Sequence, residues 1–402
     1  MKKVLTLALC AATVGCISAQ KINVDNAKKL SGKFDKIEEA RSLIKKAMED
    51  PTTANDANTY YIAGKIEMDA FDKGFQNGMI KPDDPSANPE VMAQELLNAY
   101  KYFLQALPLD SVPNEKGEIK PKVSKNIVGT LAGHANDYFK AGADMYSAQK
   151  FYPEAYEGFI IYADMPDMAF FGNKAPKLLD ADRAQAYFNA GISAYSGNEV
   201  AKAADAFKKA RLLGSDDSKV YMYEIACWQT LAQRDSALDK QAQDAIMEIA
   251  RAGFNKFGLE EPIFFNNLIN TYVQEENYDK ALSEVDALLA QNGNNANLLG
   301  LKGFIYDRKG DDNASIEAYK TAVALEDCDY ETLKNAAKKY LRVGSNKYGE
   351  LAPGDSAGKL AVKTGYFDVA NDICQRAKGL KSDDPDLTNV IDNIEYALQT
   401  YF

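Results

Sequence analysis

Ser356 is the residue whose setting most resembles that of a catalytic nucleophile. It lies within Gly354–Gly358, which reads Gly-Asp-Ser-Ala-Gly and matches the G-x-S-x-G pattern of serine hydrolases. That chemistry needs a strand–turn–helix, a histidine base and an acid that orients the base. The string instead follows Pro353 between expected helices, and the only histidine, His134, lies in a distant part of the chain. An inter-helix insertion is therefore the preferred interpretation. A serine hydrolase is kept as a second alternative, and we expect no catalytic residue.

The composition argues against metal, cofactor and nucleic-acid sites. One histidine is too few for zinc, haem or iron sites that are built from several imidazoles. Cys227, Cys328 and Cys374 show no CxxC spacing, so we expect buried free thiols. Adjacent acidic pairs lack EF-hand spacing, and no phosphate-cradling glycine loop occurs. A net charge of -11 disfavours nucleic acid as a partner, because phosphate binding needs a basic face. We therefore expect no metal and no cofactor.

The N-terminus has the pattern of a secretory signal peptide. Lys2 and Lys3 precede a mostly apolar run over residues 4–17, which is too short to span a membrane, and Ser18 and Ala19 supply small residues. We predict a signal peptide over residues 1–19. The mature chain is then exported, and we expect it in the periplasm or associated with the cell envelope of a Gram-negative bacterium. No later apolar run is long enough for a transmembrane segment.

A lipid anchor is an alternative reading of the same leader. Thr13-Val14-Gly15-Cys16 resembles a bacterial lipoprotein box, in which Cys16 would be acylated and would tether the chain to the outer membrane. The first residue of that box is normally Leu, Val or Ile, and a polar spacer normally follows the cysteine. Thr13 and Ile17 depart from both features. Cleavage after Ala19 therefore remains the preferred interpretation.

Large and small residues recur with a period of 34 residues in the second half of the chain. The first set is Phe265, Ile269, Tyr272, Ala281, Val285 and Leu288. The second set is Leu299, Gly303, Tyr306, Ser315, Tyr319 and Ala322. These spacings form the facing seams of two antiparallel helices, and the small residues let the two backbones approach each other. Ile269 is a departure from the small–large alternation, and Ser315 is a polar residue at a small position.

These residues resemble the tetratricopeptide repeat, and the resemblance extends over residues 20–402. It implies an all-α fold, a right-handed solenoid of stacked antiparallel helix pairs with loop insertions. The best copies are 136–169, 184–217, 262–295 and 296–329. Degenerate or split units are 34–56, 57–112, 218–258 and 330–384, and a capping helix is expected at 386–401. The many tyrosines are expected mainly as packing residues of the repeats.

Members of this family bind peptides or proteins in a groove lined by the first helix of each repeat. Carried onto the two best-spaced copies, the groove positions are Ile263, Asn266, Asn270, Val273, Gln274, Asn297, Gly300, Phe304, Asp307 and Arg308. The first five carry no charge, so the set lacks the Lys/Arg clamp of chaperone-binding members, and a C-terminal carboxylate ligand is disfavoured. The resemblance thus implies an exported, non-catalytic scaffold for protein or peptide interactions.

Two further hypotheses concern glycans. Carbohydrate receptors of some gut and oral bacteria are outer-membrane lipoproteins on similar helices, so glycan binding is an alternative function. This chain has a weak lipoprotein box and a single tryptophan, Trp228. Separately, three Asp-Ser-apolar strings resemble acceptors of a bacterial O-glycosylation system, at Ser111, Ser236 and Ser356. Helix capping by the aspartates is the competing explanation of these strings.

Overall fold

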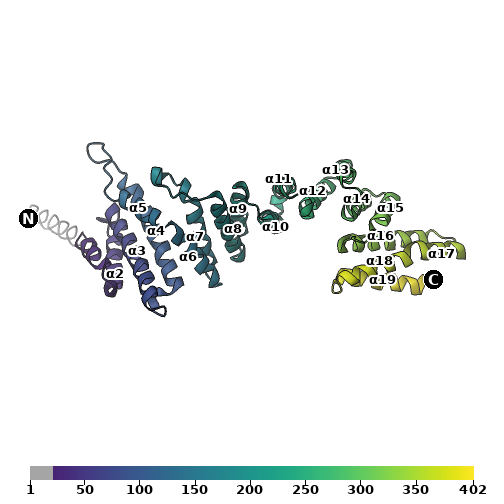
Figure 1. Ribbon diagram of the computed structural model, residues 1–402, viewed down its shortest axis with the longest axis horizontal. Coiled ribbons are helices and arrows are strands. Elements are labelled where there is room, and N and C mark those ends of the chain that lie inside the picture. Colours follow the sequence, from purple (N-terminus) through teal and green to yellow (C-terminus); the bar gives the residue numbers. More distant parts are fainter. Residues whose placement is uncertain (1–20) are drawn as a thin grey trace, which may run out of the picture. The chain divides into compact units, whose positions relative to one another are not determined.

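The computed structural model describes residues 21–402, and those residues contain helices and no β-strand (Figure 1). The predicted signal peptide over residues 1–19 and the candidate lipidation residue Cys16 lie outside the described residues. Contacts divide the chain into two compact units, Met1–Ala245 and Ile246–Phe402, with the boundary inside helix α11 (Asp239–Phe257). We describe the two units separately.

Unit 1 is a row of helices in which sequence neighbours pack against each other. The helices are α2 (Ile37–Glu49), α3 (Ala57–Ile80), α4 (Pro89–Asp110), α5 (Ser124–Gly133), α6 (Ala135–Ser147), α7 (Tyr152–Asp164), α8 (Asp180–Ser196), α9 (Val200–Leu212) and α10 (Ser218–Arg234). The strongest packing joins α3 to α4, α6 to α7, α7 to α8 and α8 to α9, which Figure 1 shows side by side. Short 3₁₀ turns at η1 (Phe34–Lys36), η2 (Pro85–Ala87), η3 (Met165–Asp167), η4 (Ala169–Lys174) and η5 (Ser236–Leu238) interrupt the connections.

Unit 2 repeats the same helix-on-helix arrangement. After η6 (Gly258–Glu260), its helices are α12 (Pro262–Gln274), α13 (Tyr278–Asn292), α14 (Ala296–Lys309), α15 (Asp312–Val323), α16 (Tyr330–Gly349), α17 (Ser356–Val362), α18 (Asp368–Leu380) and α19 (Pro385–Tyr401), with a π-helical turn at η7 (Lys363–Phe367). Helix α19 lies where a capping helix is predicted. It buries Leu387, Val390 and Ile394 in the same core as α16 and α18.

Close contact between a glycine and an aromatic ring joins the two helices in four of the pairs. A Cβ atom built on the glycine would lie 2.5–2.9 Å from the ring, which is closer than real Cβ contacts come. The four pairs are Gly64 with Phe103, Gly142 with Phe159, Gly191 with Phe207, and Gly303 with Tyr319. These glycines are needed because the two helices approach too closely for a side chain, as the small–large pattern predicts.

Ser315 shows how a polar residue is accommodated at one of the small positions. Its side chain is fully buried, and its hydroxyl donates a hydrogen bond of 2.8 Å to the carbonyl oxygen of Gly303 on the facing helix. The buried hydroxyl therefore has a partner and avoids the cost of an unsatisfied polar group.

The stretch between the two helices of the split unit 57–112 is partly helical. Helix α3 continues to Ile80, and Pro82 follows its end. The last turns of α3 stay ordered because they pack against η2, and a Cβ on Gly74 would lie 2.4 Å from the carbonyl oxygen of Ser86.

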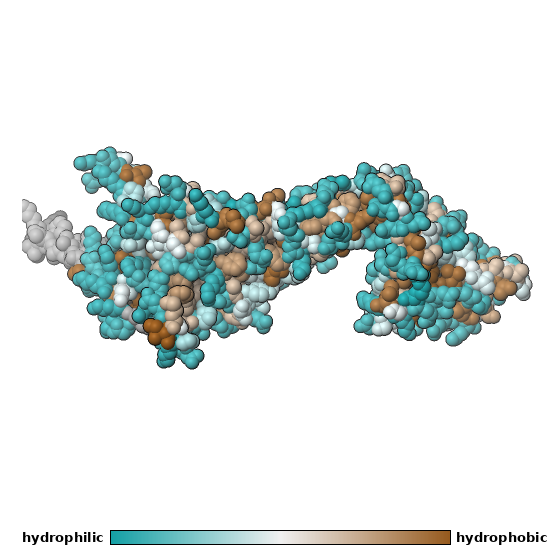
Figure 2. Space-filling view, in the orientation of Figure 1, coloured by the Kyte–Doolittle hydropathy of each residue, from teal (hydrophilic) through white to brown (hydrophobic). Residues whose placement is uncertain are grey.

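The prediction of an all-α array of helix pairs is confirmed for residues 21–402. Among these residues, no helix is both long and apolar enough to cross a membrane. Figure 2 shows that the visible surface is mostly hydrophilic, with apolar side chains in small separate groups.

Candidate functional site

A cavity of about 210 Å³ in unit 2 lies against three helices, α12, α14 and α16. We call it the asparagine pocket. Its lining residues are Asn266, Asn270, Asn297, Gly300, Leu301, Phe304, Asp329, Glu331, Thr332 and Asn335. Four carboxamides from three helices thus surround one small volume, and Leu301 and Phe304 supply its apolar part.

The N-terminal caps of α14 and α16 and the spacing along α12 position the residues that line the pocket. Asn270 lies four residues after Asn266, so both side chains share one face of α12. Asn295 caps α14 by accepting a hydrogen bond of 3.0 Å from the backbone N–H of Leu298. Asp329 caps α16 in the same way, at 2.7 Å from the N–H of Thr332. A Cβ on Gly300 would lie 2.4 Å from the Thr332 hydroxyl oxygen, so the glycine brings α14 and α16 together.

The carboxamide oxygen of Asn266 is the one unsatisfied group at this site. Its Oδ1 is buried and has no hydrogen-bond partner among the described residues. A buried acceptor without a donor costs about 1–3 kcal/mol. A ligand that brings an N–H or O–H donor into the pocket would remove that cost.

The structure brings together five of the ten predicted groove residues. Asn266, Asn270, Asn297, Gly300 and Phe304 line the asparagine pocket. The other five are not among its lining residues. Ile263, Gln274 and Arg308 are exposed, and Val273 is buried in the core, 4% exposed. Val273 is therefore placed as a packing residue.

Asp307 has a role within the fold. Its carboxylate lies 2.6 Å from the ammonium nitrogen of Lys339, whose side chain is 1% exposed, and also pairs with Arg342. Asp312 on α15 lies 2.5 Å from the same ammonium. The Lys339 ammonium lowers the pKa of Asp312, and the cluster ties α14, α15 and α16 together. Asp307 is thus engaged in ion pairs and is not among the pocket residues.

Sequence reasoning missed the residues that α16 contributes. Glu331 occupies the same repeat position as Asn297, so carrying the groove positions onto the split unit 330–384 would have found it. Asn335 falls outside those positions. Lys334 occupies the same repeat position as Gly300. It is buried, and its ammonium pairs with Asp384 at 3.1 Å.

The G-x-S-x-G string does not have the geometry of a nucleophile elbow. Ser356 is exposed and begins α17, with Asp355 capping that helix through a hydrogen bond of 2.8 Å from the N–H of Gly358. No strand precedes it among the described residues. The three cysteines of residues 21–402 are free and buried, and burial raises the pKa of the Cys227 thiol to about 12. A neutral thiol is a poor nucleophile.

All three candidate glycosylation serines are exposed, and the preceding aspartate is used locally in each case. Asp110 accepts hydrogen bonds from the backbone N–H groups of Lys122, Val123 and Ser124, which closes the loop after α4. Asp235 accepts from the N–H of Ala237. Asp355 caps α17, as described above. The capping explanation therefore accounts for these aspartates, while modification of Ser111, Ser236 and Ser356 stays a hypothesis.

His134 joins three helices of unit 1. It lies between α5 and α6, and its Nδ1 is 2.9 Å from the carboxylate of Asp137. Its Nε2 is 3.8 Å from Asp72 on α3, and its ring packs edge-on against Phe71. The hydrogen bond to Asp137 raises the pKa of His134 above its ordinary value of 6.5, although burial opposes the shift. These contacts are structural.

We expect the pKa of His134 to fall toward 6.5 in Asp137→Asn. Since the folded pKa is raised, the stability that this histidine contributes is fully present below the unfolded pKa. It is lost as the pH rises through the folded pKa. An NMR titration gives one imidazole signal, because the chain has one histidine. Equal pKa values in the wild type and the variant would show that the hydrogen bond has no effect.

No metal site emerges from the part of the chain that the structure describes, since no group of three or more His, Cys, Asp or Glu side chains there could hold an ion. The stacked antiparallel helix pairs, four of them with a glycine against an aromatic ring, define a helical-repeat scaffold.

No protein-family model matches the sequence, and a search of curated proteins gave no match. Among solved structures, the chain is similar to YrrB, a TPR protein with an unusual peptide-binding site, at 15% identity over 54% of this chain and 98% of that one, with a TM-score of 0.35. Human IFIT1 in complex with m7Gppp-AAAA matches at 12% identity over 90% and 78%, with a TM-score of 0.37. Part of a TPR protein from Cytophaga hutchinsonii matches at 16% over 77% and 98%, with a TM-score of 0.25. These similarities carry no functional conclusion for this chain.

Proposed function

We propose that this chain is a non-catalytic scaffold whose asparagine pocket binds an extended peptide segment of a partner protein. The observation that carries the proposal is the buried, unpartnered Oδ1 of Asn266. Buried polar groups in folded proteins almost always have partners, so this acceptor indicates a donor supplied from outside the chain.

Carboxamides suit a peptide backbone better than they suit most other ligands. Each asparagine side chain offers both N–H donors and an oxygen acceptor, which match the C=O and N–H of one peptide unit. An extended segment leaves its own backbone groups unpaired and therefore gains from such contacts. Asn266, Asn270, Asn297 and Asn335 supply four of these groups around one volume, and Leu301 and Phe304 can contact an apolar side chain.

The charges at the pocket favour an internal segment over a chain terminus that ends in a carboxylate. No lysine or arginine lines the pocket, whereas Asp329 and Glu331 do. Glu331 is paired with Lys334 at 3.1 Å. A free carboxylate would meet no cation there and would face acidic groups, which is unfavourable in a partly desolvated site.

The proposed setting is the bacterial cell envelope. Its support is the signal-peptide pattern of residues 1–19, which directs export. Fractionation of cells that express the full-length chain should recover it in the periplasmic or envelope fraction with the leader removed. Recovery in the cytoplasm with the leader intact would contradict this part of the proposal.

Asn266→Ala is expected to weaken peptide binding about tenfold, since one hydrogen bond in a buried site is worth about 1.5 kcal/mol. The fold should be unharmed, because the substitution removes an unsatisfied group and breaks no bond. Peptides selected from a random-sequence display library on the full-length chain serve as probes, and calorimetry gives their dissociation constants.

Asn313→Ala is the matched control, since Asn313 is an exposed asparagine of the same unit on α15 that does not line the pocket. It should bind the selected peptides as the wild type does. If the library yields no binder, or if both variants bind equally well, the asparagine pocket is not the peptide site.

A further inference from the structure

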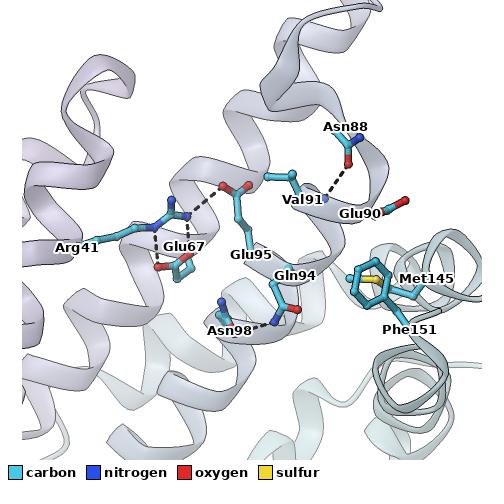
Figure 3. A pocket seen from close by; sticks show the side chains of 10 residues that line it. All are labelled: Arg41, Glu67, Asn88, Glu90, Val91, Gln94, Glu95, Asn98, Met145 and Phe151. Atoms are coloured by element: carbon cyan, nitrogen blue, oxygen red, sulfur yellow. Dashed lines mark hydrogen bonds and ion pairs between the residues drawn. The ribbon is translucent and has the colours of Figure 1, made fainter. Parts of the chain in front are cut away.

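A second cavity, of about 600 Å³, lies in unit 1. We call it the Arg41 cavity. Its lining residues are Arg41, Glu67, Asn88, Glu90, Val91, Gln94, Glu95, Asn98, Met145 and Phe151 (Figure 3). Half come from α4, Asn88 caps that helix, and α2, α3, α6 and the turn before α7 supply the rest. None of the predicted groove residues is among them.

The guanidinium of Arg41 is shared among three carboxylates. It binds Glu67 through two hydrogen bonds, Nε to Oε1 at 2.9 Å and Nη2 to Oε2 at 2.6 Å. Its Nη2 also donates to Glu95 Oε1 at 3.0 Å, and its Nη1 donates to Glu38 Oε1 at 2.6 Å. The single positive charge of Arg41 is therefore paired with three carboxylates. Two of these, on Glu67 and Glu95, are largely buried.

Glu95 has one oxygen that receives no hydrogen bond from the protein. The residue is 9% exposed, and Arg41 donates only to Oε1, so no described protein group donates to Oε2, which remains accessible to water. Figure 3 shows the dashed contact from Arg41 to one oxygen of this carboxylate, with the second oxygen turned away from the guanidinium. Burial raises the pKa of Glu95, while the hydrogen bond from Arg41 opposes the shift. This carboxylate shares its one cation, Arg41, with Glu67 and Glu38.

The rest of the cavity provides an apolar wall and several carboxamides. Val91, Met145 and Phe151 form the apolar part (Figure 3). Gln94 donates to the Asn98 oxygen at 3.0 Å, which leaves the Gln94 oxygen available as an acceptor. Lys150, which precedes the lining residue Phe151, pairs with Glu90 at 3.0 Å.

We propose that the Arg41 cavity binds the side chain of a lysine from a partner protein, with its ammonium group on Glu95 Oε2 and its aliphatic stem against Val91, Met145 and Phe151. The ammonium supplies the donor that Oε2 lacks and neutralises the excess negative charge around Arg41. The four-carbon stem matches the apolar wall, because lysine buries its stem while its charged head finds a polar partner.

Charge distinguishes this ligand from the other classes that could enter. Glu67, Glu90 and Glu95, which line the cavity, outnumber the two cations Arg41 and Lys150, so an anionic ligand meets net repulsion. A neutral sugar could hydrogen-bond to the carboxamides but would leave the charge on Glu95 uncompensated. The proposal does not depend on the peptide site of unit 2.

Nα-acetyl-lysine amide is the probe, and Nα-acetyl-norleucine amide, which has the same stem without the ammonium, is its control. We expect saturable binding of the lysine probe to the full-length chain by saturation-transfer NMR, and none of the norleucine probe. Glu95→Gln should bind the lysine probe about tenfold more weakly, as expected for loss of a charge-assisted hydrogen bond. The glutamine keeps the size of the side chain and can still accept from Arg41.

Glu38→Gln is the matched variant, because Glu38 contacts the same guanidinium but its side chain is 83% exposed and does not line the cavity. It should bind the lysine probe as the wild type does, and thermal unfolding shows that both variants fold. The proposal is overturned if the two probes bind equally, if Glu95→Gln binds like the wild type, or if methyl glycosides bind and the lysine probe does not.

Discussion

Arg211→Met is expected to lower the free energy of unfolding of unit 1 by about 3–5 kcal/mol, the usual cost of removing one partner of a buried ion pair. Arg211 on α9 and Glu224 on α10 are joined by two hydrogen bonds, Nε to Oε2 at 2.7 Å and Nη2 to Oε1 at 3.2 Å. Their side chains are 7% and 2% exposed. Without the guanidinium, the Glu224 carboxylate stays buried with its main counter-charge removed.

Trp228 makes this loss measurable. It is the only tryptophan, and it lies on α10 one helical turn after Glu224, so its fluorescence during urea unfolding reports on this part of the chain. The double variant Arg211→Met/Glu224→Leu is the control, and it should regain most of the stability, because two apolar side chains replace the pair and no charge remains buried. If the double variant is as unstable as the single one, the loss of stability comes from lost packing and not from the uncompensated charge of Glu224.

The helix pairs could be predicted from the sequence because their signal is local and repeated. Gly191 and Phe207, like Gly303 and Tyr319, are separated by sixteen residues within one helix–turn–helix, so the spacing itself carries the contact. The same period explains why five of the predicted groove residues line one cavity, the asparagine pocket. They lie on the first helices α12 and α14, where the repeat is regular.

The parts that were missed depend on contacts that no period encodes. Asp307 has the position of a groove residue, but its partner Lys339 lies thirty-two residues away on an irregular unit. Whether a carboxylate faces solvent or a buried ammonium is decided by that distant residue. The Arg41 cavity is a stronger case. Arg41, Glu67 and Glu95 come from α2, α3 and α4, and the spacing between these helices does not follow the 34-residue period.

The sequence also could not show which polar groups lack partners. Asn266 and Asn270 look alike as exposed amides of one helix face, yet only the Oδ1 of Asn266 is buried without a donor. Glu38 and Glu95 both contact Arg41, yet only Glu95 is buried. Burial and unmet hydrogen bonds are properties of the packed helices, and the two proposed binding sites rest on them.

Phe207→Ala is the second large effect that we expect, a loss of about 3–5 kcal/mol in the free energy of unfolding. The ring is fully buried on α9. It stacks on Tyr223 of α10 with centroids 5.5 Å apart, and it lies against Gly191 of α8. Its removal opens a cavity that cannot collapse easily, because three helices meet around it. Urea unfolding followed by Trp228 fluorescence measures the loss, since that residue lies on α10.

A pair of substitutions at the same contact tests whether the small residue and the ring are coupled. Gly191→Ala alone would place a Cβ atom 2.5 Å from the Phe207 ring, so it should be destabilising although alanine favours helices. In Gly191→Ala/Phe207→Leu the new methyl group enters space that the smaller side chain leaves free. The double variant should therefore lose less stability than the sum of the two single losses, whereas additive losses would mean that the two residues contribute independently. The same contact between a glycine and an aromatic ring recurs at Gly64, Gly142 and Gly303. A double variant that loses less stability than the sum of the single losses would therefore indicate that this contact stabilises all four helix pairs in the same way.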